Sequence, residues 1–427
     1  MRDTCIIGAG PAGLAAARAL KDKGLPYTHI ERHSDVGGLW DIDAPGTPMY
    51  ESAHFISSKT LSGFGGFPMP DDYPDYPGHK LILAYLRSFA DHFGLRENIE
   101  FSTEVARVEK TDDGYRVTRA DGRSTEHGQV IVASGVQWIP SIPELPGSYT
   151  GEVRHTVSYR SPHEFDGRRV LVVGAGNSGC DIACDAARNA EHAAISVRRG
   201  YWFIPKHVFG MPSDVFAESG PTLPMWIEQP VFGWMLRLLT GDPRRLGLPK
   251  PDHKVFETHP ILNSQLLHHL QHGDITARPA IADTSGTTVT FTDGTTEDVD
   301  LIMLATGYKH AVPYAQDLFG SEQHPDQMYL TAFSRHEGLY GLGFVETNGA
   351  AYLLMSQLAA MVASHIADKE ARPEKYARFE KEIQTVEPDL TRGLKLVNSP
   401  RHKGYVDGVA ITRYIRKTAR RMGWDVP

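Results

Sequence analysis

The sequence predicts an α/β protein of two domains, each built on a parallel β-sheet, and three observations support this fold class. The chain has 427 residues, more than a single compact core usually holds. Residues 5–20, "CIIGAGPAGLAAARAL", form an apolar stretch, a glycine-rich loop and a helical pattern. Residues 170–183, "VLVVGAGNSGCDIA", repeat this succession, which is typical of the first half of a βαβ unit in a parallel sheet.

The first unit predicts its elements in a simple order. A helix is expected from about residue 11 to residue 23, followed by a strand at 27–31. Residues 51–77 are rich in Gly, Pro, Phe and Tyr, which indicates an irregular and functional segment. A helix is then predicted at 80–95, strands at 99–110, 114–120 and 127–135, and a proline-rich crossing at 136–147.

The second unit begins near residue 169, and its helix is expected to end at about residue 189. Residues 201–263 are rich in Pro, Trp and Phe and show poor periodicity. A helix is predicted at 263–274, and a hairpin with a buried strand at 288–308. The last third contains a loop, a strand at 339–346 and helices.

Both loops match the pattern G-x-G-x-x-G, and each stands between a strand and a helix, where the pattern predicts a Rossmann-like dinucleotide site. Gly8 allows the tight turn, Gly10 lets a pyrophosphate approach the backbone, and Gly13 lets the helix pack closely on the strand. The N-terminus of the helix adds positive partial charge for the phosphates. The second loop offers the same three positions, Gly174, Gly176 and Gly179.

The two units differ at the end of the strand that follows the helix. In the first unit this position is Glu31, whose carboxylate accepts hydrogen bonds from ribose hydroxyls and repels a 2′-phosphate. In the second unit the strand ends in Arg198 and Arg199 without an acid, and a guanidinium suits a 2′-phosphate. A solvated strand end is the simpler explanation of these arginines, but their position and charge together favour the phosphate.

Two dinucleotides bound at once predict electron transfer between them, and FAD with NADPH fits the two sites. We expect an FAD-binding domain of residues 1–157 and 301–427, with an NADPH-binding domain of residues 158–300 inserted into it. The active site would lie between the domains. Four aromatic residues of the inserted domain could line its entrance, although a place in the domain core explains each more simply: Trp202, Phe203, Phe209 and Trp226.

Composition excludes several other classes of protein. A net charge of -8 offers no global field for nucleic acid. The three cysteines make no disulfide framework, which fits a reducing, cytoplasmic location. The longest apolar run, residues 350–366, is too short and too polar to span a bilayer, so no integral membrane segment is expected. The histidines of residues 268–274 are expected on a helix surface, and no metal is predicted.

Five motifs occur in order along the chain: "ERHSDVGGLW" at 31–40, "VASG" at 132–135, "YTGEVRHTVSY" at 149–159, the second glycine loop and "LATGY" at 304–308. They resemble motifs of flavin-containing monooxygenases, which are class B flavoprotein monooxygenases, and indicate a bacterial-type member without a membrane span. The third resembles the family fingerprint F-x-G-x-x-x-H-x-x-x-[YF], with Tyr149 in place of Phe. The resemblance covers nearly the whole chain, with the motifs in the family's order.

The resemblance implies a reaction. NADPH reduces FAD by hydride transfer, oxygen adds to the reduced flavin at C4a, and the hydroperoxide passes one oxygen atom to an amine nitrogen or a sulfide sulfur. The partners would be a small-molecule substrate and O2. The sequence leaves the substrate, the strictness of NADPH preference over NADH and the oligomeric state open, a homodimer included.

The resemblance also implies cofactor contacts, which fall into three groups. Those expected at FAD are Gly8, Gly10, Pro11, Ala12, Gly13, Glu31, Arg32, Gly38, Leu39, Trp40, Val105 and Ser134. Those expected at NADPH are Gly174, Gly176, Asn177, Ser178, Gly179, Asp181, Arg198 and Arg199. His155 is expected to hold the linker between the domains. Thr306 and Gly307 belong to the "LATGY" motif, whose counterpart in the first half of the chain is "VASG".

One departure from the family pattern lies beside the flavin. Many members carry an Asn in a stretch like Thr-Asn-Ser-Ser-Lys, whereas this chain has Ile56 at that cofactor-facing position. An Ile donates no hydrogen bond, and a lost donor at a developing charge costs about 3 kcal/mol. Ser57, Ser58 or bound NADP⁺ could compensate, or the neighbourhood has repacked. Ser57, Ser58 and Asn348 are therefore the candidate catalytic groups.

Three alternatives remain beside oxygenation of nitrogen or sulfur. A Baeyer–Villiger or decarboxylating variant is suggested by Ile56, but that branch usually ends its fingerprint in Trp-Asp or Pro-Asp, and this chain has Tyr159 and Arg160. An NADPH oxidase or reductase on the same scaffold would need no substrate oxygenation, although a disulfide reductase needs a C-x-x-C that the sequence lacks. A flavin-binding sensor would not need a second dinucleotide site.

Overall fold

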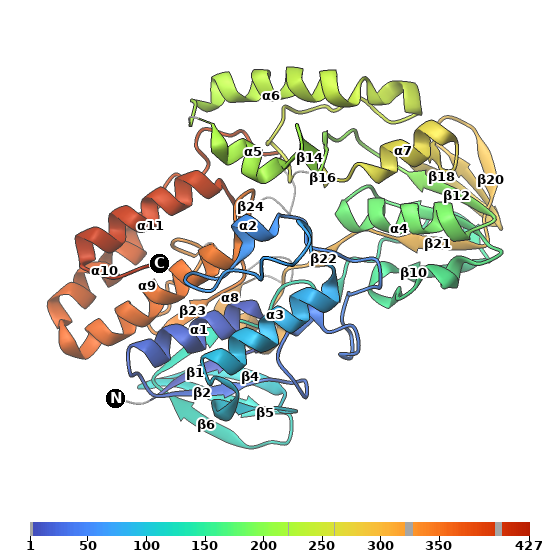
Figure 1. The fold of residues 1–427 in the computed structure, drawn as a ribbon. Helices are drawn as coiled ribbons and strands as arrows, with labels where there is room; N and C mark the ends of the chain where they lie inside the picture. Colours follow the sequence, from blue (N-terminus) through green and yellow to red (C-terminus); the bar gives the residue numbers. More distant parts are fainter. Residues whose placement is uncertain (1–2, 221, 260, 321–327, 398–403) are drawn as a thin grey trace.

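The computed structural model describes residues 3–220, 222–259, 261–320, 328–397 and 404–427. These residues form two five-stranded parallel sheets with helices packed on them (Figure 1). The α/β class and the duplicated parallel unit predicted from the sequence are confirmed.

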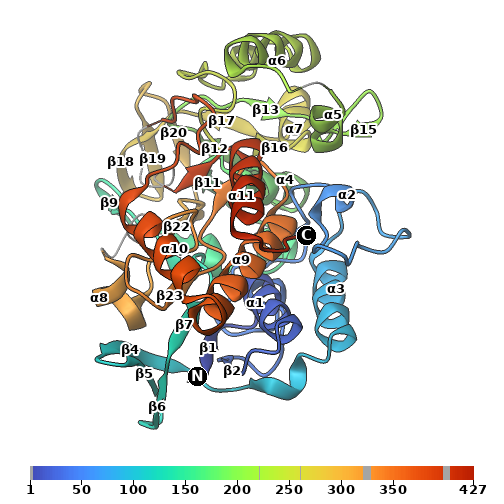
Figure 2. The same ribbon diagram turned by 90° about the vertical axis from the view of Figure 1, so that its left-hand side faces the viewer.

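The first sheet has the strand order β23-β7-β1-β2-β3. All of its neighbouring strands run parallel, and the central strand is fully buried. Helices α1 (Pro11–Asp22) and α9 (Ala351–Ala371) lie side by side on this sheet, so the two ends of the chain share one core (Figure 2). The strands are β1 (Thr4–Ile7), β2 (Tyr27–Ile30), β3 (Ile99–Glu100), β7 (Gln129–Val132) and β23 (Leu339–Gly341).

The second sheet has the strand order β10-β21-β11-β12-β17, again all parallel. Its order β21-β11-β12-β17 repeats β7-β1-β2-β3 of the first sheet, so the repeated sequence is a repeated structure. Two of its strands lie outside the segment 158–300. The strands are β10 (Glu152–His155), β11 (Arg169–Val173), β12 (His192–Ser196), β17 (Thr276–Arg278) and β21 (Leu301–Leu304), with helices α4 (Asn177–Asn189) and α7 (Gln265–His272).

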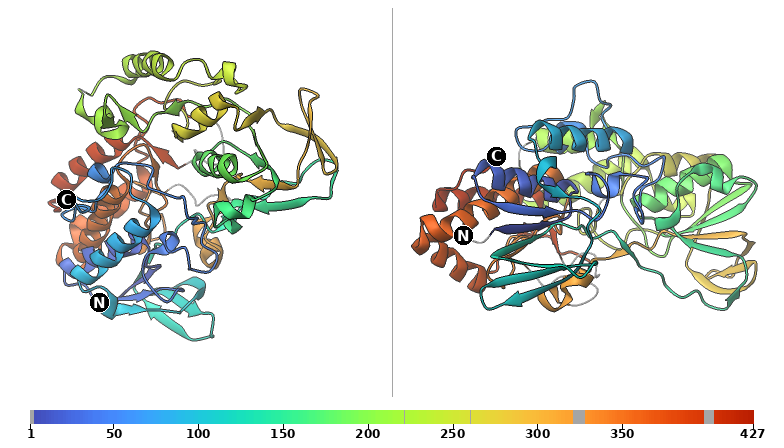
Figure 3. Two further views of the ribbon diagram at one scale, coloured as in Figure 1. Left: turned by 45° about the vertical axis from the view of Figure 1, so that its right-hand side comes forward. Right: turned by 90° about the horizontal axis from the view of Figure 1, so that it is seen from below.

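The chain crosses between the two sheets at one place. Strand β8 (Ile139–Pro140) lies on the outward crossing and pairs antiparallel with β22 (Tyr308–Lys309) on the return. The two sheets consequently lie side by side, which is clearest in the right-hand view of Figure 3. The paired crossing fixes both linkers to each other and places them between the sheets.

Smaller elements surround this frame. Two smaller sheets flank the parallel ones. The first is antiparallel and consists of β4 (Val105–Thr111), β5 (Gly114–Arg119) and β6 (Ser124–His127). The second is mixed: β18 (Ile281–Gly286), β19 (Thr288–Phe291) and β20 (Thr296–Asp298) run antiparallel, and β9 (Ser148–Tyr149) pairs parallel with β18. The other α-helices among the described residues are α2 (Lys59–Ser62), α3 (His79–His92), α5 (Ser213–Ser219), α6 (Met225–Thr240), α8 (Gln316–Phe319), α10 (Pro373–Thr385) and α11 (Gly408–Met422). The short strand pairs are β13 (Phe203–Ile204) with β16 (Ile261–Leu262), β14 (His207–Val208) with β15 (Met211–Pro212), and β24 (Glu346–Thr347) with β25 (Tyr405–Val406).

Residues 201–263 are more regular than the sequence predicts, because they contain helix α6. Apolar side chains stand on both faces of α6 and Pro230 lies inside it, which hides the helical period. Trp226 is 76% exposed on this helix, and Phe209 in the preceding hairpin is 78% exposed. The expectation that they belong to the domain core is wrong for these two residues, whereas Phe203 is buried.

Candidate functional site

The first glycine loop, Gly8–Gly13, is shaped by contacts that exclude side chains; we call it the first cradle. Gly8 has φ +104°, and a Cβ on it would lie 2.6 Å from the carbonyl oxygen of Ala133. A Cβ on Gly13 would lie 1.7 Å from the carbonyl oxygen of Gly8. In the part of the chain that the structure describes, no side chain caps α1 at Gly10, so Pro11 and Ala12 begin the helix beneath free backbone donors. The cradle fits a pyrophosphate.

Glu31 lies buried at the end of β2 and faces the first cradle. Its Oε2 accepts a hydrogen bond of 2.5 Å from the N–H of Ala9, and its Oε1 accepts one of 2.8 Å from the N–H of His33. Each carboxylate oxygen keeps a further lone pair for a ribose hydroxyl. Two backbone donors from either side therefore fix the acid where the sequence predicts a ribose contact.

The other residues predicted at FAD gather around this strand end. The guanidinium of Arg32 stacks over the Trp138 ring at 4.0 Å. The Ser134 hydroxyl accepts a hydrogen bond of 2.8 Å from Tyr314, directly after β7. Val105 is buried at the start of β4, close in sequence to Thr103, whose N–H donates to the carbonyl of Glu31.

A second glycine segment, Gly37–Gly38, packs directly against the first cradle. Gly38 has φ +58°, and a Cβ on it would lie 2.9 Å from the Cα of Gly10. Leu39 accepts a hydrogen bond of 2.7 Å from the hydroxyl of Thr47 at its carbonyl oxygen. Trp40 stacks on Phe55 with ring centroids 5.3 Å apart. The motif at 31–40 is thus packed onto the loop predicted to hold the pyrophosphate.

The stack of Trp40 on Phe55 leads directly to the candidate catalytic stretch. Ile56 is 41% exposed, so its side chain is not sealed in a repacked core. The Ser57 hydroxyl accepts a hydrogen bond of 2.7 Å from Ser62. The N–H of Ser58 donates to Oδ2 of Asp214 at 2.6 Å, and its buried hydroxyl has no partner among the described residues. An unpartnered buried hydroxyl here is available to a bound group.

Asn348 is engaged elsewhere. Its Oδ1 accepts a hydrogen bond of 2.8 Å from the N–H of Gly408, and its Nδ2 donates to Asp407 at 3.4 Å. These contacts join the start of α9 to the start of α11. The structure does not bring Asn348 into contact with Ser57 or Ser58 through any hydrogen bond that the described residues make.

The second glycine loop, Gly174–Gly179, has the same geometry; we call it the second cradle. Gly174 has φ +110°, and a Cβ on it would lie 2.6 Å from the carbonyl oxygen of Ala305. A Cβ on Gly179 would lie 2.1 Å from the carbonyl oxygen of Gly174. Gly176 caps α4 with its backbone alone, and the Asn177 side chain accepts a hydrogen bond from Leu262. This loop also fits a pyrophosphate.

Asp181 turns away from the second cradle and joins α4 to the first part of the chain. Its carboxylate accepts hydrogen bonds from the hydroxyl of Tyr50 at 3.2 Å and from Nδ2 of Asn263 at 2.7 Å. The Ser178 side chain also hydrogen-bonds Tyr50. Burial raises the pKa of Asp181 to about 7.

Asp185, one turn further along α4, makes a second contact of this kind. Its Oδ2 accepts hydrogen bonds from Ser52 at 2.5 Å and from Tyr159 at 2.9 Å. Segment 50–52 is therefore held on α4 by two carboxylates. The sequence assigned Asp181 to the cofactor, and no local pattern indicated its contact with Tyr50.

His155 and the "LATGY" turn hold the two linkers together. The Nε2–H of His155 donates to the carbonyl of Gly307 at 3.0 Å, and its Nδ1 accepts from the N–H of Val157 at 3.1 Å. Thr306 donates its hydroxyl to the carbonyl of Ser141 at 2.5 Å. Burial lowers the pKa of His155, which keeps the ring neutral. These residues lie where the chain crosses between the sheets.

An acid from a distant segment, Asp252, lies at the end of β12, and the sequence pattern did not reveal it. Arg198 is exposed, and Arg199 is half-buried. The Nη2 of Arg199 donates to both carboxylate oxygens of Asp252, at 2.9 and 3.2 Å. Asp252 lies 53 positions further along the chain. No periodicity or motif could have placed it there.

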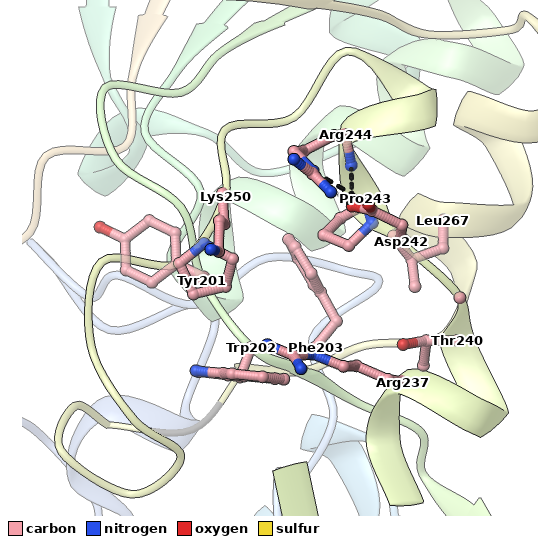
Figure 4. A pocket seen from close by; sticks show the side chains of 12 residues that line it. Tyr201, Trp202, Phe203, Arg237, Thr240, Asp242, Pro243, Arg244, Lys250 and Leu267 are labelled. Carbon is pink, nitrogen blue, oxygen red and sulfur yellow. Dashed lines mark hydrogen bonds and ion pairs between the residues drawn. The ribbon is translucent and has the colours of Figure 1, made fainter. Parts of the chain in front are cut away.

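A pocket of about 460 Å³ opens directly after Arg199 (Figure 4). Aromatic side chains from the segment after β12 face cations from the end of α6 and the loop beyond it. One of these cations, Arg244, pairs with Asp242 at 2.5 Å. The main lining side chains are Tyr201, Trp202, Phe203, Arg237, Arg244 and Lys250.

Comparisons with known proteins agree with this geometry. Residues 1–384 match a family model described as flavin-binding monooxygenase-like. The probable indole-3-pyruvate monooxygenase YUCCA9 of Arabidopsis thaliana is 32% identical over 355 residues, covering 79% of this chain and 83% of the relative. Flavin-containing monooxygenase 2 of Homo sapiens is 32% identical over 359 residues, covering 78% of this chain and 67% of the relative.

Solved structures share the fold. The S-allyl-L-cysteine S-oxygenase from Allium sativum superposes with a TM-score of 0.68 at 22% identity, covering 100% of this chain and 89% of that chain. A steroid monooxygenase bound to NADP superposes with a TM-score of 0.72 at 21% identity, covering 100% and 99%. Among the described residues, no helix combines the length and apolar character needed to cross a membrane. The chain belongs to the flavin-containing monooxygenase family and is an FAD- and NADPH-dependent monooxygenase.

Proposed function

We propose that the chain inserts one oxygen atom of O2 into an amine nitrogen or a sulfide sulfur of a small molecule. The observation that carries this proposal is that segment 55–58 links the two dinucleotide-binding parts. Phe55 stacks on Trp40 above the first cradle, and Ser58 donates its N–H to Asp214 of the inserted segment. A segment held at both ends can keep two cofactor rings together.

When bound, FAD and NADPH supply the hydride transfer and the activation of oxygen. The residues of this chain would hold them: Glu31 at the ribose of FAD, the first cradle at its pyrophosphate, the second cradle at the pyrophosphate of NADPH, and Arg199 at the 2′-phosphate. Phe55 also packs edge-to-face on Tyr352, at 5.2 Å, and Tyr352 is buried. These aromatic rings would exclude water from the reacting centre.

The direct test is a substrate panel under 18O2. Purified enzyme with NADPH would be given a tertiary amine, an aryl methyl sulfide and a cyclic ketone. We expect an N-oxide or a sulfoxide that carries one 18O atom. An ester or lactone as the dominant product would overturn the assignment, and so would stoichiometric H2O2 without any oxygenated product.

Oxygenation at a carbonyl carbon is a second candidate, and two observations favour it. Ile56 offers no amide donor at the position where many family members have Asn. YUCCA9 is named a probable indole-3-pyruvate monooxygenase, and its substrate is a 2-oxo acid. An aryl 2-oxo acid therefore joins the panel, and its oxidative decarboxylation would establish this candidate in place of the first.

We also propose a cytoplasmic location and a homodimer, and an inserted domain that is wider than 158–300, because β10 and β21 belong to its sheet. The location is proposed because the three cysteines are free and buried, which agrees with a reducing compartment. Helix α6 exposes Trp226, Trp234 and Leu238, which a second copy could cover. Light scattering coupled to size exclusion tests the dimer, and a monomer mass at all concentrations would exclude it.

A further inference from the structure

The Arg199–Asp252 pair differs from a simple phosphate-binding arginine. Nη2 of Arg199 is shared between the two oxygens of Asp252, while its buried Nε has no partner among the described residues. An incoming group therefore meets a guanidinium that is already engaged at one nitrogen, together with a carboxylate. The site combines the group that favours a 2′-phosphate with the group that favours a ribose hydroxyl.

Asp252 is held in this place from two directions. Gly200 forms a bridge with Pro251, and a Cβ on Gly200 would lie 2.3 Å from the carbonyl carbon of Lys250. Only a glycine lets the segment press so closely on the end of β12. From the other side, Nδ1 of His253 hydrogen-bonds Oδ1 of Asp252 at 2.8 Å.

His253 is itself held by hydrogen bonds, so it keeps the Asp252 carboxylate in position. Its Nε2 hydrogen-bonds the hydroxyl of Thr258 at 3.0 Å, and its carbonyl accepts from Nε1 of Trp202 at 2.9 Å. The hydrogen bond from His253, with Arg199 in second place, lowers the pKa of Asp252 to about 2. Asp252 is 58% exposed, so a bound nucleotide can reach it.

We propose that Asp252 is a specificity-determining residue of the second dinucleotide site, where it reduces the preference for NADPH over NADH. The carboxylate occupies one donor of Arg199, repels a 2′-phosphate and accepts a hydrogen bond from an unphosphorylated ribose. This inference rests on the proposed placement of NADPH at the second cradle. Lys250 and Arg237 in the adjoining pocket supply positive charge that keeps the phosphate acceptable.

The test separates the 2′-phosphate from the rest of the nucleotide. Calorimetry on the FAD-loaded enzyme would compare adenosine 2′,5′-bisphosphate with adenosine 5′-monophosphate. We expect Asp252→Asn to tighten binding of the bisphosphate about five- to tenfold, the effect of one removed charge in a solvent-exposed site. Binding of the monophosphate should stay unchanged or weaken. Asp121→Asn is the matched control, because Asp121 makes the same kind of exposed ion pair with Arg123. This variant should change the affinity for neither ligand.

Two results would overturn the proposal. Weaker binding of the bisphosphate to Asp252→Asn would mean that Asp252 only orients Arg199. An equal change for both ligands would mean that it does not sense the 2′-phosphate. A second variant, Arg199→Gln, tests separately whether NADPH binds at the second cradle with its 2′-phosphate at Arg199. If Arg199→Gln leaves the bisphosphate affinity unchanged, the 2′-phosphate does not bind at Arg199 at all.

Discussion

The two cradles share a strand order and a loop geometry, yet the residues proposed to select their nucleotides are placed by different means. At the first, Glu31 lies 22 residues after Ala9 and is locked by backbone donors on both sides. At the second, Arg199 projects from the strand end and meets an acid 53 residues away. The proposed selectivity residue of the first cradle is fixed within one βαβ unit. That of the second cradle pairs with an acid that tertiary packing brings from a distant segment.

The comparison also extends to the helices. Ala15 and Asp181 both stand two residues after the third glycine of their loops, on α1 and α4. Ala15 is buried among apolar residues of the shared core, but Asp181 meets Tyr50 across the boundary between the two parts. At this position the first helix packs within one core, while the second joins the two parts of the chain.

The largest effects are expected from filling the cradles. Gly13→Ala places a Cβ 1.7 Å from a carbonyl oxygen and should yield protein without FAD. Gly179→Ala makes the same clash at 2.1 Å in the second cradle. It should keep FAD but reduce it more than about 100-fold more slowly with NADPH, because misplaced reactants lose rate steeply. Flavin absorbance and anaerobic reduction rates measure the two losses, with circular dichroism to verify folding. Equal loss of FAD in both variants would contradict the proposal that the first cradle binds FAD and the second binds NADPH.

The next effect concerns the fixed acid of the first cradle. Glu31→Gln keeps the size and shape of the side chain but replaces the charged carboxylate by a neutral amide. The NH2 group of the amide then faces a backbone N–H and cannot accept its hydrogen bond. Hydrogen bonds to charged groups contribute about 1.5–3 kcal/mol, so FAD affinity should fall roughly 10- to 100-fold. Equilibrium dialysis of FAD measures this change, and NADPH binding should be unaffected. A variant with unchanged FAD affinity would show that Glu31 supports only the loop.

A smaller effect is expected at the helix contact, and it depends on pH. Burial raises the pKa of Asp181 to about 7 from an ordinary value near 4, so the folded protein binds a proton more tightly than the unfolded chain does. Stability from this group is therefore present at low pH and is lost as the pH rises from about 4 through 7. Asp181→Asn should raise the Tm relative to wild type by a few degrees more at pH 8 than at pH 5.5.

Scanning calorimetry at the two pH values measures this difference. Asp121→Asn serves again as the control, because the pKa of Asp121 is lowered by Arg123 and its charge does not change in this window. A pH-independent difference for Asp181→Asn would mean that the carboxylate stays ionised between Tyr50 and Asn263.

The same contrast explains how much the sequence could predict. Strand, loop and helix limits of both units follow local patterns, so the helix expected from residue 11 to 23 is α1 at Pro11–Asp22. Gly13 and Glu31 were identifiable because their partners, Gly8 and Ala9, lie within one unit. Asp252 was not, because Gly200 and His253 place it through packing alone. Helix α6 was missed because its apolar residues face solvent as well as the core.

The smallest effect is expected between the two cradles, at Ile56. The side chain is partly exposed beside Phe55 and the buried, unpartnered hydroxyl of Ser58, so an amide can be accommodated there. Ile56→Asn should restore a hydrogen-bond donor and reduce the fraction of NADPH lost as H2O2 about two- to fivefold. This is less than the full value of a donor, because on our proposal the Ser58 hydroxyl compensates in part. Ile56→Val is the control that keeps the position apolar. Oxygen consumption with and without catalase measures the coupling. If Ile56→Asn and Ile56→Val release the same H2O2, segment 55–58 stabilises the reacting centre through Ser58 and its tie to Asp214 alone.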